Sequence, residues 1–171
     1  VMTRLKGDTA VGHVRYSTTG GTLFRNVQPL FAEFAFGGLA MAHNGNFTNG
    51  WALRRALVDQ GSIFQSTSDT EVLIHLIATS TYSGVIDRFV DALRSVVGAY
   101  ALVALTDDAV IGMRDPLGVR PLVLGTLDGA HILASESCAL DIIGAQHVRD
   151  VAPGEIIVID RRGVQSLSPF A

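Results

Sequence analysis

Residues 34–49 read FAFGGLAMAHNGNFTN, and this stretch sets the order of a buried strand followed by a helix. Its first half is apolar and contains two glycines, which predicts chain packed inside the protein. The polar run His43-Asn44-Gly45-Asn46 then follows directly. An Asn-Gly pair after a strand ordinarily forms a tight turn. The same pair could instead aim the Asn44 amide and the Gly45 N–H at one spot, as in a two-donor oxyanion hole.

Three stretches after this run have helical spacing. The first begins near Thr48 or Asn49 and continues to about Gln60, with Gly61 placed as a left-handed cap. The second starts at residues 67–69 and continues to about Ser80, and the third covers about residues 85–95. A further short helix is predicted over Cys138–Ile143.

The rest of the chain has the alternation or the apolar runs of strands. The expected strands are Thr9–Val14, Glu33–His43, Gly98–Leu105, Val110–Arg114, Leu122–Leu127, His131–Ser135, Glu155–Asp160 and Val164–Leu167. Asp128-Gly129 and Arg161-Arg162-Gly163 separate neighbouring strands as hairpin turns do. Strands before and after a helical block, with hairpins in the second half, predict an α+β fold of mainly antiparallel sheet. Two sheets between helical layers satisfy this pattern.

Composition narrows the class of protein. The chain has 171 residues, 48% of them hydrophobic, enough for one buried domain. A net charge of −3 gives no basic surface for nucleic acid, and no apolar run is long enough to span a membrane. The single cysteine, Cys138, indicates a reducing cytoplasm and is interpreted as core rather than as a nucleophile. The histidines lack metal-ligand spacing, so no metal site is expected.

Two other stretches could bind a small molecule. In GHVRYSTTG (residues 12–20), Arg15 ends a predicted strand beside hydroxyl residues, which suits bidentate capture of a carboxylate or phosphate. The alternative is an exposed arginine before a loop. In TSDTE (residues 67–71), Asp69 is either a helix cap or an acid that holds a ligand ammonium group. The residues alone leave both alternatives open.

Six motifs in this order resemble the glutaminase domain of the glutamine phosphoribosylpyrophosphate amidotransferase family. They are GHVRYSTTG, AHNGNFTN, TSDTEVL, RDPLGVRPLVLG, ASESCALD and RDVAPGE, and the resemblance extends from about residue 9 to residue 160. RDPLGVRPLVLG and RDVAPGE favour this family over glucosamine-6-phosphate synthase and asparagine synthetase. The resemblance implies a four-layer αββα sandwich of the N-terminal nucleophile hydrolase type.

The resemblance also implies roles for individual residues. Arg15 corresponds to the arginine that pairs with the α-carboxylate of glutamine, and Thr18 lies in the same closing loop. Asn44 and Gly45 correspond to the oxyanion hole, and Asp69 to the acid that holds the α-ammonium. The nucleophile of the family is an N-terminal cysteine whose own α-amine acts as the base.

The chain shows no such N-terminal cysteine, so we expect a partial domain, 1–171, that lacks the nucleophile and the first strands and is inactive alone. The phosphoribosyltransferase domain is expected elsewhere in the same polypeptide. Magnesium, any iron–sulfur cluster and assembly into a homo-oligomer are expected to depend on that other part. A related amidotransferase with another ammonia acceptor and a non-catalytic glutamine-binding module are the alternatives.

Overall fold

The computed structural model describes residues 7–14 and 23–170. In chain order these residues form a 3₁₀ turn (Phe24–Asn26), β1 (Leu30–Phe34), β2 (Gly37–Phe47), α1 (Gly50–Asp59), α2 (Thr70–Thr79), α3 (Val85–Arg94), β3 (Gly98–Thr106), β4 (Val110–Arg114), β5 (Val123–Leu127), β6 (Ala130–Ala134), α4 (Ser137–Ile143), β7 (Gln146–Asp150), β8 (Ile156–Asp160) and β9 (Gly163–Leu167). Within this part of the chain, no helix has the length and apolarity needed to cross a membrane.

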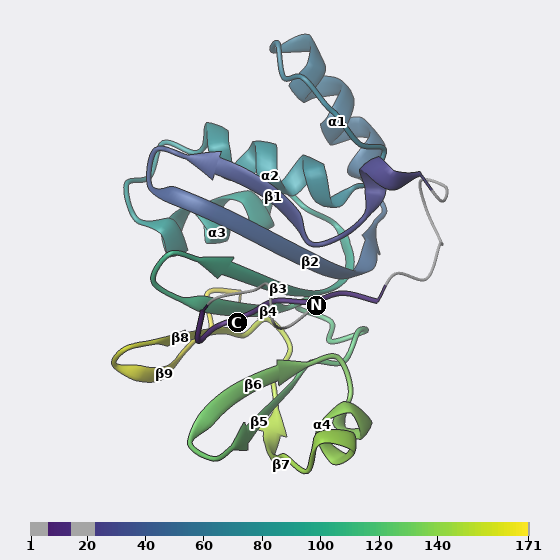
Figure 1. Ribbon diagram of the computed structural model, residues 1–171. Helices are drawn as coiled ribbons and strands as arrows, with labels where there is room; N and C mark the ends of the chain where they lie inside the picture. The colour runs from purple at the N-terminus through teal and green to yellow at the C-terminus, as the bar shows by residue number, and fades with distance from the viewer. Residues whose placement is uncertain (1–6, 15–22, 171) are drawn as a thin grey trace.

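Two antiparallel sheets organise these elements. The larger sheet has the strand order β1-β2-β3-β4-β8-β9, and the smaller has the order β6-β5-β7 (Figure 1). Every pairing between neighbouring strands is antiparallel. The predicted α+β class with antiparallel sheets is therefore confirmed.

The larger sheet is covered on both faces. On one face, buried side chains of α2 and α3, such as Leu73 and Phe89, pack against β2, β3, β4 and β8. On the other face, Leu122 and Leu124 of the smaller sheet's region pack against Ala101 and Ile157. Helix α4 lies beside the smaller sheet (Figure 1). Its buried Leu140 packs in a cluster with Val123 of β5. Burial of these apolar side chains on both faces of β3 explains why that strand has no polar alternation.

Two predictions about strands were wrong, and one strand was not predicted. Glu33–His43 is not one strand, because a two-residue turn separates β1 from β2. Thr9–Val14 is not a strand: no neighbour pairs with it within the described residues, and Val14 is 97% exposed. Strand β7 was not expected, because its side chains are mostly exposed and carry no apolar alternation. The other predicted strands and all four helices are present within one or two residues of their expected ends.

The motif RDPLGVRPLVLG begins with a tightly bonded loop. The Asp115 carboxylate is fully buried and accepts hydrogen bonds from the backbone N–H groups of Leu117, Val119 and Arg120. The Arg114 guanidinium donates hydrogen bonds to three backbone carbonyl groups, those of Gly118, Arg120 and Val151. Buried charges are tolerated only when they are satisfied in this way. The motif thus holds the connection between β4 and β5 in place.

The motif RDVAPGE closes a similar turn through an ion pair. Glu155 is buried and receives two hydrogen bonds from the Arg149 guanidinium, at 2.6 and 2.8 Å. The backbone N–H of Ala152 and the hydroxyl of Ser166 also donate to it, at 2.6 and 2.5 Å. The Arg149 partner, which outweighs the opposing effect of burial, lowers the pKa of Glu155 from 4.5 to about 2.

Glu155→Gln should therefore lower the free energy of unfolding at pH 7 by about 2 kcal/mol, a figure reduced because the Arg149 side chain is 40% exposed. Since the folded pKa lies below the unfolded one, this stabilisation is present above about pH 4.5 and is lost as the pH falls toward 2. Denaturant unfolding at pH 7 and at pH 3 should show that the free energy of unfolding changes less with pH in the variant than in the wild type. Asp150→Asn, at a side chain 72% exposed, is the matched control and should change little. Equal pH effects in wild type and Glu155→Gln would contradict this assignment.

Candidate functional site

Three of the predicted site residues line one cleft. Asn44 and Gly45 on β2 and Asp69 at the start of α2 all contact an open cleft of about 1330 Å³. The far wall of this cleft is formed by β6 and the start of α4, and residues 8–14 also contribute to it. Arg15 and Thr18 lie outside the described residues. The structure therefore brings together the expected oxyanion pair and the expected ammonium-binding acid.

The Asn44-Gly45 pair is part of a strand and not a turn, which corrects the local interpretation. Strand β2 pairs with β3 without interruption from Leu39 opposite Thr106 to Phe47 opposite Gly98. Asn44 lies opposite Ala101, and Gly45 lies opposite Tyr100. Pairing with a central strand outweighs the turn preference of an Asn-Gly dipeptide, because each residue gains ladder hydrogen bonds and burial.

Gly45 is required by a close approach of backbone. Its φ is +154°, and a Cβ built at this position would lie 2.0 Å from the carbonyl oxygen of Ala99 and 2.9 Å from Nε2 of His43. No larger residue fits there without moving β3 or the histidine ring. The glycine of the motif thus serves the close packing of β2 on β3.

The side-chain amide of Asn44 makes no hydrogen bond within residues 7–14 and 23–170, although the residue is half-buried at the cleft. Polar groups in such positions normally have a partner in the protein or in what binds there. An amide without a protein partner and facing a cleft can donate to a developing negative charge. This is the chemical feature that the predicted role of Asn44 needs.

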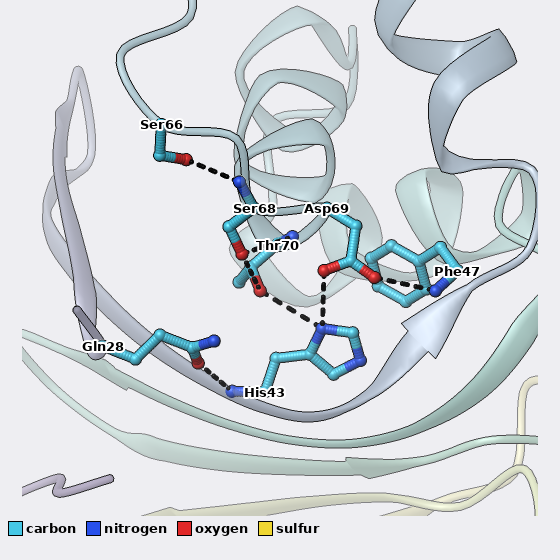
Figure 2. Close-up of polar contacts among 7 residues, drawn as sticks. All are labelled: Gln28, His43, Phe47, Ser66, Ser68, Asp69 and Thr70. Atoms are coloured by element: carbon cyan, nitrogen blue, oxygen red, sulfur yellow. Dashed lines mark hydrogen bonds and ion pairs between the residues drawn. The ribbon is translucent and has the colours of Figure 1, made fainter. Parts of the chain in front are cut away.

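Asp69 precedes α2 but does not cap it. Its side chain makes no capping hydrogen bond, which removes the simpler of the two explanations for this residue. Instead, Oδ2 accepts a 2.8 Å hydrogen bond from the Phe47 backbone N–H, and Oδ1 lies 3.7 Å from Nδ1 of His43 (Figure 2). Burial raises the pKa of Asp69, but His43 and the Phe47 N–H outweigh it, so the pKa is lowered and the group is a carboxylate at neutral pH.

His43 is a buried member of this cluster that the sequence did not single out as a site residue. Its Nδ1 lies 3.2 Å from the Thr70 hydroxyl, and its ring stacks on Phe47 with centroids 4.5 Å apart (Figure 2). Thr70 is in turn bonded to Ser68. The alternation of the strand could have identified it. Side chains of a strand alternate between its two faces, and Leu39, Met41 and Phe47 face the core, so His43 lies on the same buried face.

Cys138 was expected in the core but is exposed. Helix α4 directs Leu140 into the interior, whereas Cys138 lies at the cleft with its Sγ 3.7 Å from a carboxylate oxygen of Glu136. The apolar neighbours Ala139 and Leu140 did not predict its burial correctly, because this seven-residue helix buries only one of its sides against the small sheet.

A protein-family profile described as "Glutamine amidotransferase domain" matches residues 13–141, which is most of the chain and includes the whole cluster around Asn44 and Asp69. The chain belongs to this family. Most of the residues that line the cleft lie within this glutamine amidotransferase domain.

Individual relatives narrow the comparison. The domain is 55% identical over 167 residues to an amidophosphoribosyltransferase of Rhizobium etli, covering 98% of this chain and 34% of the relative. It is 53% identical to a chloroplastic amidophosphoribosyltransferase of Glycine max, covering 97% of this chain and 30% of that one. The predicted resemblance to this enzyme's glutaminase domain is confirmed. The chain spans about a third of the length of these relatives.

A solved structure agrees with this comparison. Glutamine phosphoribosylpyrophosphate amidotransferase from B. subtilis, complexed with ADP and GMP, superposes with a TM-score of 0.87 at 44% identity, over 92% of this chain and 34% of that chain. The antiparallel α+β arrangement described above is therefore that of a glutamine amidotransferase domain.

Proposed function

We propose that this domain hydrolyses glutamine to glutamate and ammonia, and that the ammonia is transferred to phosphoribosylpyrophosphate to give phosphoribosylamine, the first committed step of de novo purine biosynthesis. The observation that carries the proposal is the placement in one cleft of the Asn44 amide, which has no hydrogen-bond partner among the described residues, and the ionised Asp69. The relatives named amidophosphoribosyltransferase support the choice of acceptor.

In this proposal each residue recognises one part of the substrate. Asp69 holds the α-ammonium of glutamine, and Arg15, with Thr18 in the same loop, holds the α-carboxylate. The thiol of an N-terminal cysteine attacks the side-chain amide carbon, and its α-amine takes the thiol proton and passes a proton to the leaving nitrogen. Asn44 and the N–H of Gly45 stabilise the oxyanion of the tetrahedral intermediate. Ammonia leaves, a γ-glutamyl thioester forms, and water then releases glutamate.

The complete protein in this proposal is a homo-oligomer in the cytoplasm with a phosphoribosyltransferase domain in the same polypeptide. Its glutaminase domain is a four-layer αββα sandwich of the N-terminal nucleophile hydrolase type, to which strands outside 1–171 contribute. The domain itself needs no cofactor, and magnesium or an iron–sulfur cluster would belong to the rest of the polypeptide. A sugar-phosphate or aspartate acceptor and a non-catalytic glutamine-binding module are the competing functions.

The experiment compares the 171-residue chain with the longer protein that contains it. The chain alone should release no glutamate from glutamine, because its one cysteine, Cys138, is internal and has no free α-amine to act as base. The longer protein should form glutamate and phosphoribosylamine from glutamine and phosphoribosylpyrophosphate, as measured by coupled assay.

Cys138→Ser is the control for both proteins. Glutaminase activity in the isolated chain that Cys138→Ser abolishes would overturn the proposed nucleophile. Glutamate release by the longer protein without use of phosphoribosylpyrophosphate would favour another acceptor. Glutamine binding without hydrolysis by the longer protein would favour the non-catalytic module.

A further inference from the structure

We propose that His43 is a positioning residue, which orients the Asp69 carboxylate for the ammonium group of the substrate through the close contact of Nδ1 with Oδ1. This inference rests on the proposed function, because it assumes that Asp69 binds an ammonium group. It assigns to a buried histidine a role in substrate affinity that is separate from the chemical step.

The two oxygens of Asp69 are held by two residues of one strand. Oδ2 accepts from the Phe47 backbone N–H at 2.8 Å, and Oδ1 faces Nδ1 of His43 at 3.7 Å (Figure 2). Both partners belong to β2, the strand that also carries Asn44 and Gly45. The contact therefore fixes the ammonium-binding end of the site relative to the oxyanion end, although the two ends come from different elements.

Nδ1 of His43 lies within hydrogen-bond distance of the Thr70 hydroxyl, at 3.2 Å, and 3.7 Å from Oδ1 of Asp69. An ionised carboxylate can only accept, so Nδ1 attracts Oδ1 when this nitrogen carries a hydrogen. The other nitrogen, Nε2, is buried and has no hydrogen-bond partner among the described residues. A hydrogen on Nε2 would be a buried donor without an acceptor, which is costly, so the geometry favours the tautomer that carries its hydrogen on Nδ1.

The Asp69 carboxylate has few charged neighbours among the described residues. Among the described residues, Asp69 forms no ion pair with a lysine or an arginine, and His43 is its sole ion-pair neighbour. The Asp69 side chain keeps 16% of its surface exposed at the cleft, whereas that of His43 keeps 1%. The exposed part of the carboxylate can therefore meet a cation.

His43 is itself held in one orientation. Its backbone N–H donates to Oε1 of Gln28 at 2.7 Å, and Nδ1 lies 3.2 Å from the buried hydroxyl of Thr70. Thr70 is bonded to Ser68 at 3.1 Å, and the ring stacks on Phe47 with an interplanar angle of 22° (Figure 2). A side chain held at its backbone and on two sides of its ring can impose a fixed direction on Asp69, which a mobile side chain could not do.

The test uses three variants in the longer protein that contains this domain: His43→Asn, His43→Gln and His43→Leu. Asparagine places its N–H₂ at the same number of bonds from the backbone as Nδ1, and glutamine places its own at the position of Nε2. Leucine keeps apolar volume without a donor. Kinetics with glutamine, and separately with ammonia, give KM and kcat for each protein.

We expect His43→Gln and His43→Leu to raise KM for glutamine about tenfold, with kcat changed less than about threefold. His43→Asn should keep KM within about threefold of wild type, although asparagine fills the site less well. Ammonia-dependent activity should be unchanged in all three. In a double-mutant cycle with Asp69→Asn, His43→Gln should add little to the KM effect of Asp69→Asn alone.

Equal KM effects of all three variants, or a fall in kcat at unchanged KM, would overturn the role of Nδ1 and leave His43 as a packing residue. Additive effects of His43→Gln and Asp69→Asn would also overturn it. The same measurements distinguish a failure of the proposed function itself. In that case Asp69→Asn would leave KM for glutamine unchanged, or the wild-type protein would not use glutamine.

Discussion

Asn44→Ala is expected to lower glutamine-dependent turnover of the complete protein by about 10²–10³-fold, since one donor to the oxyanion is lost. The expected loss is in kcat rather than in KM, because the amide bonds to charge that develops only in the transition state. The Asn44 amide makes no hydrogen bond within the described part of the chain, so its removal breaks no hydrogen bond there. Steady-state kinetics with glutamine and with ammonia measure the effect.

Two controls accompany this prediction. Ammonia-dependent synthesis should be unchanged in Asn44→Ala, and loss of both activities would indicate a folding role. Gln165→Ala removes an exposed amide from β9 and should alter neither activity. Asn44→Asp keeps the shape but adds an acceptor and a negative charge, and it should be at least as damaging as alanine. Normal glutamine turnover in Asn44→Ala would reduce this residue to a simple strand position.

Gly45→Ala is expected to destabilise the domain by about 3 kcal/mol or more and to abolish glutamine use. The added Cβ would lie 2.0 Å from the Ala99 carbonyl oxygen and 2.9 Å from Nε2 of His43, and the φ of +154° is one that alanine rarely adopts. The structure must therefore move β2 away from β3. Alanine keeps the backbone N–H, so the expected loss arises from displacement of the donor and not from its removal.

Denaturant unfolding of Gly45→Ala and wild type measures this free energy. Gly12→Ala is the matched control, because a Cβ at Gly12 meets no atom of the described residues within 4 Å and its φ imposes no strain. The free energy of unfolding should change by less than about 0.5 kcal/mol. A Gly45→Ala protein with wild-type stability would mean that β2 and β3 can separate without cost at this point.

Much of the fold could be predicted because its signals are local. Helices α1, α2 and α3 have apolar residues at helical spacing, and the hairpin of β5 and β6 turns at Asp128-Gly129, where both residues have positive φ. The errors fell where an element depends on distant partners. Strand β7 is exposed and is defined by its pairing with β5, and Thr9–Val14 has strand-like residues but no paired neighbour within the described residues.

The candidate site shows the same division. Order and spacing of motifs placed Asn44, Gly45 and Asp69 in one family pattern, and the structure brings these three residues to one cleft. The position of His43 behind Asp69 could not be inferred, because residues 43 and 69 are joined only through packing of α2 on β2. Arg15 and Thr18 remain predictions.

By itself, the sequence determined the class of fold and the family, since both are written in residue types at fixed spacing. Only the tertiary structure decided the conformation of AHNGNFTN and the bonding of Asp69. Locally, Asn44-Gly45 favours a turn and Asp69 favours a helix cap. Pairing of β2 with β3 keeps Asn44-Gly45 in a strand. The carboxylate of Asp69 accepts a hydrogen bond from the N–H of Phe47 instead of capping α2. In both cases long-range hydrogen bonds outweigh the local conformational preference. They form in a buried setting, where an unsatisfied polar group costs more free energy than a local preference contributes.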